Sequence, residues 1–335
     1  MTQRQSEICF VKSNWDLISG IHRFSHEAMA TTFEVIILHE DARYAQQAAW
    51  AAFDELGRLE AELSRFIENS DISRINNLAA NQPLQIGLAA FECLQLCARI
   101  YAETNGAFDI TIGSLLGCWV NEDETMRIPS EEQLNLARQC TGLQLLRLDE
   151  AEHTVHLLTD SVQIDLGGFG KGYAVDQMGK LLREWSIDTA LIHGGGSSVL
   201  ALGGPPGGDP VLAKRRKMGT RTKGWPLTLS SPGNHKQTLA RFYLQDRALS
   251  GSGLQKGHLF IDPRTAQPVE NKRAAWACAS TAATADALST AFMLMSPDEV
   301  NHYCLSHSDV LAMIVMKDQG REPQKDEILR YGHWD

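Results

Sequence analysis

The sequence has no apolar run long enough to cross a membrane, and Met1–Gly20 lacks the basic start and apolar stretch of a secretory signal. Its seven cysteines are scattered, without the cysteine and histidine spacing of a metal site. We therefore expect buried free thiols in a reducing compartment. These absences predict a cytoplasmic protein with no membrane segment, unless a leader was removed.

An excess of positive charge is also missing. Lysine and arginine number 31 against 41 acidic residues, and the net charge of -10 argues against nucleic acid as the main partner. Hydrophobic residues make up 43% and charged residues 21%, which is typical of a soluble globular protein. No repeat or linker divides the chain, so we expect residues 1–335 to form a single unit.

Helices and strands are expected without a regular alternation. Apolar periodicity and caps predict helices over 41–64, 88–104, 172–185 and 281–295, with another from Ser130. Short apolar runs predict strands over 33–38, 153–158, 162–166, 189–193 and 197–202. This mixture favours an α+β or mixed-sheet fold over a doubly wound one.

The most informative stretch, residues 162–176, combines a short apolar run, a cluster of glycines and the start of a helix. Glycines let a backbone approach a ligand closely, and a helix N-terminus offers N–H groups to an anion. Lys171 adds a cation and Asp165 a carboxylate, so the set suits a ligand that carries phosphate. Neither the P-loop nor the dinucleotide fingerprint is matched. A tight turn without a ligand is the alternative.

A second candidate site lies on the predicted helix 281–295. Asp286 and Thr290 are four residues apart and share one face of that helix. Because the apolar residues lie roughly opposite, both side chains can be interpreted as solvated surface. A carboxylate and a hydroxyl one turn apart can also supply two oxygen ligands to Mg²⁺, which keeps several waters and shares phosphate oxygens.

Two further segments carry candidate residues. His258 precedes the turn sequence Asp262-Pro263-Arg264-Thr265, and a histidine at the start of a strand is more often structural than catalytic. Residues 107–109, Ala-Phe-Asp, follow a glycine that ends a helix. That loop can hold a ring by stacking and hydrogen bonding, but packing inside the protein is the simpler interpretation.

Six motifs, in sequence order, resemble those of the ApbE family, the FAD:protein FMN transferases. They cover most of the chain and are Met29–Phe33, Leu63–Phe66 with Asp71–Arg74, Gly106–Asp109, Asp165–Gly172, His258 with Asp262–Thr265, and Thr284–Leu288. Three departures are visible. The segment from Ser250-Gly251 to His258 is shorter than the family often has. Ser197 stands where the family commonly has aspartate after two glycines, and Ala266 stands where it has glycine after Asp-Pro-Arg-Thr.

The resemblance implies a two-lobed fold with FAD in a cleft between the lobes and Mg²⁺ on the FAD pyrophosphate. It implies flavin contacts from seven residues: Met29, Phe66, Ala107, Phe108, Asp109, Asp165 and Lys171. It also implies metal ligation by the Gly168 carbonyl, Asp286 and Thr290. Family members attach FMN to a threonine or serine of a target protein and release AMP, and some instead hydrolyse FAD to FMN and AMP.

The residues fit this chemistry. Attack on the phosphorus of a pyrophosphate requires neutralised oxygens and an aligned nucleophile more than covalent help. Mg²⁺ and Lys171 would supply the charge, and a base near the incoming hydroxyl would accelerate the step. His258 is the first candidate for that base and Asp286 the second. Three hypotheses follow: an FMN transferase, an FAD pyrophosphatase, and a flavin-binding protein without turnover.

Overall fold

The structure, a computed structural model, describes residues 11–13, 20–121, 125–205, 224–232, 234–254, 259–317 and 327–334. Helices and strands are mixed along the chain, which confirms the predicted α+β class. Across the described ranges, none of the helices has both the length and the apolar character that a membrane crossing requires. That the chain acts as a single unit stays a prediction.

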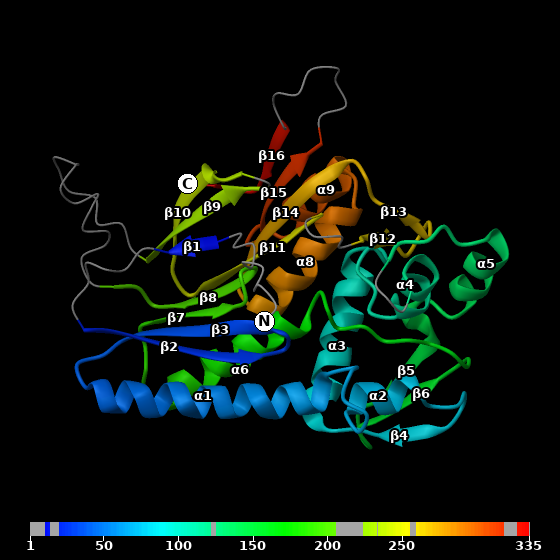
Figure 1. Ribbon diagram of the computed structural model, residues 1–335, viewed down its shortest axis with the longest axis horizontal. Helices are drawn as coiled ribbons and strands as arrows, with labels where there is room; N and C mark the ends of the chain where they lie inside the picture. Colours follow the sequence, from blue (N-terminus) through cyan, green and yellow to red (C-terminus); the bar gives the residue numbers. More distant parts are fainter. Residues whose placement is uncertain are drawn as a thin grey trace.

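Within the described ranges, the central layer is an eight-stranded antiparallel sheet in the order β16-β15-β14-β11-β8-β7-β3-β2 (Figure 1). Its strands are β2 (Ile21–Ala28), β3 (Thr31–Leu38), β7 (Ala190–Gly194), β8 (Ser198–Leu202), β11 (Arg247–Gly253), β14 (Lys272–Ala279), β15 (Leu311–Met316) and β16 (Glu327–Tyr331). Strands β7 and β8 lie at the strands predicted over 189–193 and 197–202, and they pair with each other. The sequence did not predict β11 and β14, which are rich in alanine, glycine and serine.

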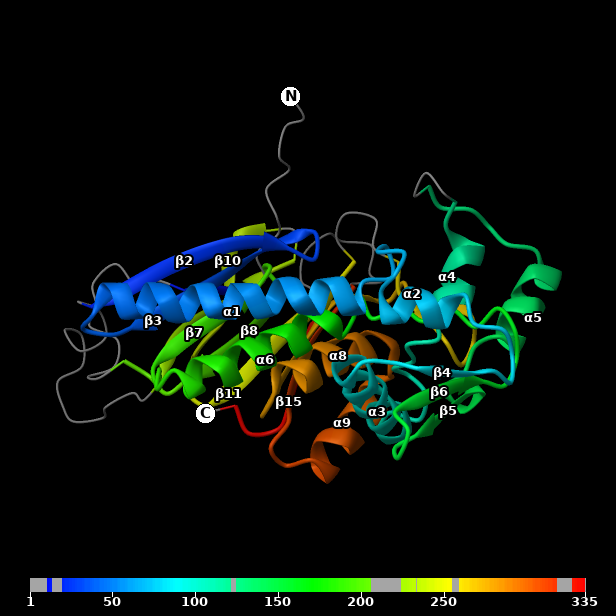
Figure 2. The same ribbon diagram turned by 90° about the horizontal axis from the view of Figure 1, so that it is seen from below.

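Three helices cover one face of this sheet: α1 (Ala42–Leu63), α6 (Gly170–Glu184) and α8 (Ala282–Leu294) (Figure 2). Their apolar faces and the facing strands form the larger core, in which Leu56, Val175 and Leu288 are fully buried. The opposite face of the sheet is covered by β1 (Val11–Ser13), β9 (Trp225–Ser231) and β10 (Asn234–Leu244). The central sheet therefore lies between a helical layer and a second sheet.

A second region gathers around α3 (Leu88–Glu103), beyond the end of α1 (Figure 1). It contains α2 (Asp71–Asn76), α4 (Gly113–Trp119), α5 (Glu131–Gln139), the short helix η1 (Leu143–Leu145) and a sheet of β4 (Pro83–Gln85), β6 (Thr154–Leu157) and β5 (Leu146–Asp149). The hairpin of β12 (Ile261–Asp262) and β13 (Gln267–Pro268) packs against α4 and α5 through Ile261 and Ala266. Helix α9 (Pro297–Ser306) follows α8.

The predicted strand over 162–166 is wrong. Only Gln163 makes a β-bridge, to Ile112, and the backbone of Ile164 is bound instead by a side chain. The Asn76 amide donates to the Ile164 carbonyl at 3.0 Å, and its oxygen accepts from the Ile164 N–H at 2.6 Å. Because one asparagine satisfies both groups, no neighbouring strand is needed, and the chain is free to enter the glycine turn. Helix α6 then begins at Gly170, two residues earlier than predicted.

Helices α6 and α8 approach each other closely because residue 172 has no side chain. A Cβ atom placed on Gly172 would lie 2.3 Å from the Ala282 carbonyl oxygen and 2.8 Å from the Asp286 Cβ. A larger residue would therefore force the two helices apart, although glycine in a helix is itself unfavourable.

This contact gives a stability prediction. Gly172→Ala should lower the free energy of unfolding by about 1–3 kcal/mol, because overpacking outweighs the gain in helix propensity. Gly57→Ala on α1, where a Cβ atom meets nothing within 4 Å, should raise it by about 0.5–1 kcal/mol. Urea denaturation of both variants tests this, and equal stabilisation by the two substitutions would contradict the close contact.

His193 of β7 is buried, and that burial, with the nearby Arg23 charge, lowers its pKa to about 4. The unfolded chain takes up this proton near the ordinary histidine value, so between roughly pH 6.5 and pH 4 the unfolded state binds more protons. The contribution of His193 to stability is therefore complete above that window and is lost as the pH falls through it.

We predict that acidification from pH 6.5 to 4 costs the protein up to about 3 kcal/mol through His193 alone. His193→Gln should lack this component, so the difference in unfolding free energy between the two proteins should change with pH across the window. Denaturation curves at matched pH values measure it, and a constant difference would show that His193 titrates normally.

Candidate active site

The glycine turn before α6 is held in shape by its own side chains. Asp165 Oδ1 accepts a hydrogen bond from the Gly167 N–H at 2.7 Å, and Asp165 Oδ2 lies 3.3 Å from Arg65 Nε. Lys171 Nζ donates to the Gly167 carbonyl oxygen at 3.0 Å and is only half-buried. The Lys171 ammonium group therefore lies over the turn, where it can exchange this carbonyl for a phosphate oxygen.

The backbone N–H groups at this helix start are less available than the sequence suggested. Those of Phe169 and Gly170 donate to the Leu166 carbonyl at 2.9 and 2.7 Å. The Gly172 N–H donates to Asp286 Oδ2 at 3.0 Å, so a carboxylate of the protein already occupies the position that an anionic ligand would take. A phosphate bound here would therefore rely on Lys171 and a cation more than on these three N–H groups.

Asp286 is only 3% exposed, and interpreting it as solvated surface is therefore wrong. Most of α8 is buried, and its N-cap Thr281 accepts from the Thr284 N–H. The bond from Gly172 uses Oδ2 of Asp286, and the hydrogen bonds among the described residues include none to its Oδ1. One oxygen of this buried carboxylate thus fixes its orientation, and the other is free to bind a ligand.

Thr290 and Gly168 lie against each other across the same contact. A Cβ atom on Gly168 would be 2.8 Å from Thr290 Oγ1, which also lies 3.3 Å from Ser252 Oγ of β11. The structure therefore brings together Gly168, Asp286 and Thr290, the three predicted metal ligands, from segments more than 100 positions apart in sequence.

A carboxylate, a hydroxyl and a carbonyl are oxygen donors of the kind that Mg²⁺ prefers, so these residues fit that ion. Within the described part of the chain, no group of three His, Cys, Asp or Glu residues gathers to hold a metal. A cation at this place would consequently have one acidic ligand from the protein, and phosphate oxygens of a bound ligand would complete its coordination.

The predicted flavin contacts fall into a group that is exposed or half-buried and a group that is buried. Phe66 is 84% exposed, and the Arg65 guanidinium, which also pairs with Asp165, lies 4.6 Å from its ring centroid. An exposed aromatic ring beside the glycine turn suits stacking. Met29, in the turn between β2 and β3, has φ 50° and donates its N–H to Glu60 Oε1.

The second group, residues 107–109, is buried. Phe108 packs against Phe169 of the glycine turn, with ring centroids 6.5 Å apart. Asp109 Oδ1 accepts from the Thr111 N–H and hydroxyl at 2.8 and 2.6 Å, and burial raises the Asp109 pKa. The loop is tied to the glycine turn by the Asp165 N–H, which donates to the Ile110 carbonyl at 2.7 Å. Packing accounts for these side chains, and their contact with FAD stays a prediction.

His258, the first candidate for a base, lies outside the described residues. The sequence that follows it forms the predicted turn, and Ala266 adopts φ 59°, a conformation that glycine favours. The glycine that the family has at this place is thus replaced without losing the left-handed backbone, and the Ala266 N–H donates to the Asp262 carbonyl at 2.7 Å.

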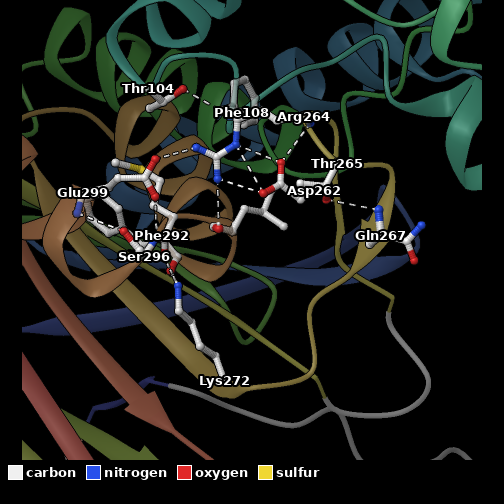
Figure 3. A network of polar contacts seen from close by, with 12 residues as sticks. Thr104, Phe108, Asp262, Arg264, Thr265, Gln267, Lys272, Phe292, Ser296 and Glu299 are labelled. Atoms are coloured by element: carbon white, nitrogen blue, oxygen red, sulfur yellow. Dashed lines mark hydrogen bonds and ion pairs between the residues drawn. The ribbon is translucent and has the colours of Figure 1, made fainter.

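Sequence reasoning missed the cations that hold the C-terminal end of α8 (Figure 3). Lys272, 1% exposed, donates to the Phe292 carbonyl at 2.7 Å and to the Met295 carbonyl. Arg264 donates to Asp262, to Glu299 Oε1 at 2.7 Å and to the Leu294 carbonyl at 3.2 Å. Cations near helix C-termini are a known pattern, but these two come from distant segments, so spacing alone could not reveal them.

Two surface hollows lie apart from this cluster. One, of about 210 Å³, is between β2 and α1, and the other, of about 230 Å³, is between α3 and the strand β5. Neither is lined by a predicted site residue.

Comparison with known proteins settles the family. Residues 29–315 match the model of the ApbE family. The chain belongs to this family. The resemblance seen in the sequence is therefore confirmed.

Relatives and solved structures agree with this assignment. The FAD:protein FMN transferase of Escherichia coli K12 is 26% identical over 288 residues, 82% of this chain and 78% of the relative. The FAD:protein FMN transferase of Chlamydia trachomatis is 29% identical over 240 residues, which are 68% of this chain and 69% of the relative. The apo flavinyl transferase ApbE of Pseudomonas stutzeri superposes with a TM-score of 0.78 at 24% identity, over 95% and 96% of the two chains. The Vibrio cholerae ApbE flavin transferase superposes with a TM-score of 0.75 at 20% identity, over 93% of this chain and 97% of the other.

The contact between Gly168 and Thr290 yields a test of the ligand cluster. Gly168→Ala should weaken Mn²⁺ binding in the presence of FAD by about tenfold or more, because the added methyl pushes the turn away from α8. Gly170→Ala, whose Cβ atom would meet only Leu166 at 3.8 Å, is the matched control and should bind as the parent does. Electron paramagnetic resonance of Mn²⁺ measures both, and unchanged binding by Gly168→Ala would remove that residue from the site.

Proposed function

We propose that this chain transfers the FMN part of FAD to a threonine or serine hydroxyl of a target protein, with Mg²⁺, and releases AMP. The observation that carries the proposal is the convergence of Gly168, Asp286 and Thr290 beside Lys171, in a member of the ApbE family. Curated relatives over most of the chain are named FAD:protein FMN transferases, which supports the same reaction here.

In this reaction the hydroxyl oxygen of the target attacks the phosphorus of the FMN half of FAD. A new P–O bond forms, the bond to the bridging oxygen breaks, and AMP leaves with that oxygen. A bound Mg²⁺ would neutralise pyrophosphate oxygens. Lys171, which is only half-buried above the turn, would leave the Gly167 carbonyl and donate to a phosphate oxygen.

The hydroxyl proton requires an acceptor. Asp286 has one oxygen bound to the Gly172 N–H, so its remaining oxygen can hold a cation or take a proton, but cannot do both at once. Since we assign that oxygen to the cation, we assign the proton to His258. Phe66 would stack on a ring of FAD, because its own ring is exposed next to the turn.

We also propose that residues 1–335 act as one catalytic unit, since the cluster needs both α6 and α8 with the loops before them. We further propose that the protein works in the cytoplasm. Its described cysteines are free thiols, and Cys93, Cys97, Cys278 and Cys304 are buried, as in proteins of reducing compartments.

The deciding experiment incubates the protein with FAD, Mg²⁺ and candidate acceptor proteins, followed by mass measurement of each protein and chromatography of the nucleotides. AMP together with an acceptor heavier by one FMN group supports the proposal. AMP with free FMN in the presence of a competent acceptor would replace it with FAD hydrolysis. FAD that stays bound and intact would make the chain a flavin-binding protein without turnover.

Asp286→Asn tests the carboxylate in the same assay. The amide oxygen can still accept from the Gly172 N–H, but the charge on the second oxygen is lost, so AMP release should fall by about 10²–10³-fold. Asp54→Asn, an exposed substitution on α1, is the control and should keep full activity. Normal AMP release by Asp286→Asn would refute the assignment of this residue.

A further inference from the structure

Helices α6 and α8 cap each other. Asp286 of α8 accepts from the Gly172 N–H in the first turn of α6. Asp176, two turns into α6, accepts from the N–H groups of Ala282 and Ala283 in the first turn of α8, at 2.7 and 2.8 Å. Each helix therefore begins under a carboxylate supplied by the other.

This exchange satisfies groups that have no partner inside their own helix. The first four N–H groups of a helix lack intrahelical acceptors, and a carboxylate is stabilised near them by the helix dipole. The N-cap of α6, Phe169, makes no side-chain cap bond, so Asp286 substitutes for one. Helix α8 has Thr281 as its own N-cap, yet it receives both oxygens of Asp176 in addition.

Two parallel hydrogen bonds from neighbouring N–H groups to one carboxylate fix direction as well as distance. Asp286 lies one turn beyond Ala282 in α8. The position of the first turn of α8 therefore sets the distance between Asp286 and the start of α6. The missing side chain at Gly172 allows the two helices to come this close, because a Cβ atom there would collide with the Ala282 carbonyl.

The arrangement places two carboxylates near each other at one crossing. The pKa of Asp176 is raised to about 6, chiefly by burial and also by the charge of Asp286, although the two backbone bonds and Lys180 act in the opposite direction. The charged form of Asp176 is therefore unfavourable at this place, and the two hydrogen bonds from the backbone of α8 are what offset that cost. A purely structural cap could be a neutral serine or threonine, as it is for α5 and α9.

We propose that Asp176 is a positioning residue for the ligand cluster. By holding the first turn of α8, it keeps one oxygen of Asp286 on the Gly172 N–H, so that Asp286 stays beside the turn in which Gly168 lies against Thr290. The role of the cluster in binding a cation rests on the proposed function, whereas the hydrogen bonds between α6 and α8 do not depend on it.

The first test uses the protein without metal or flavin. In Asp176→Ala, hydrogen exchange of backbone amides should accelerate by about tenfold or more, both at residues 282–283 and at Gly172, whose N–H is bound by Asp286 and not by the Asp176 side chain. Ser130→Ala removes a comparable cap from α5, which carries no site residue, and should accelerate exchange in α5 only. Faster exchange at 282–283 with an unchanged rate at Gly172 would reduce Asp176 to a local cap and overturn the proposal.

The second test measures Mn²⁺ binding by electron paramagnetic resonance in the presence of FAD. Asp176→Ala should weaken it by about tenfold or more, and Asp176→Asn by less, since one amide oxygen can still accept from one of the two N–H groups. In the AMP assay, the half-saturating Mg²⁺ concentration should rise more than the rate at saturating Mg²⁺ falls. Ser130→Ala should change neither quantity.

Asp176→Asn, which has nearly the same shape as the parent, decides the matter if Asp176→Ala does not fold. Parent-like Mn²⁺ affinity in a folded Asp176→Asn variant whose amides at 282–283 exchange faster would overturn the proposal. If the exchange and Mn²⁺ results are as expected but the parent protein releases no AMP, the positioning role stands and the proposed reaction is the part that fails.

Discussion

The close crossing of α6 and α8 is the contact on which the candidate site depends. It is possible because Gly172 has no side chain, and it is fixed because two carboxylates are exchanged between the helix N-termini. Without it, the glycine turn and Asp286 would be separate features of the sequence. With it, Gly168, Asp286 and Thr290 form one group of oxygen donors at the start of α6.

The rest of the fold holds α8 from its other sides. Lys272 and Arg264 bind carbonyls at its C-terminal end, so a cation faces one end of the helix and a carboxylate the other, as the helix dipole favours (Figure 3). Beneath it, β11 and β14 present small residues, and Ser252 bonds to Ser289 at 2.8 Å. Small side chains on both surfaces let the helix lie close to the sheet, which makes its position rigid.

Arg264 links the segment that follows His258, the candidate base, to α8. Arg264 follows His258 by six residues and binds α8 and α9 together, so the chain after His258 is anchored to the helix that carries Asp286.

Local chemistry is what the sequence predicted well. Helices α1, α3 and α8 follow from apolar periodicity, the turn at 263–266 from proline and its neighbours, and the family from six motifs in order. Failures came where partners are distant in sequence. Residues 162–166 are not a strand because Asn76 binds their backbone, and β11 and β14 were missed because their small residues have low strand propensity and are paired only by the surrounding sheet.

The sequence by itself determined which residues can bind a phosphate or a cation, since this follows from side-chain chemistry and from the conformations open to glycine. Only the tertiary structure decided that Asp286 is buried, that one of its oxygens is committed to Gly172, and that Asp176, Lys272 and Arg264 hold its helix. The physical reason is that burial and hydrogen bonding between helices depend on what packs across the contact, and α8 meets partners more than 100 positions away in the chain, such as Gly168 beside Thr290.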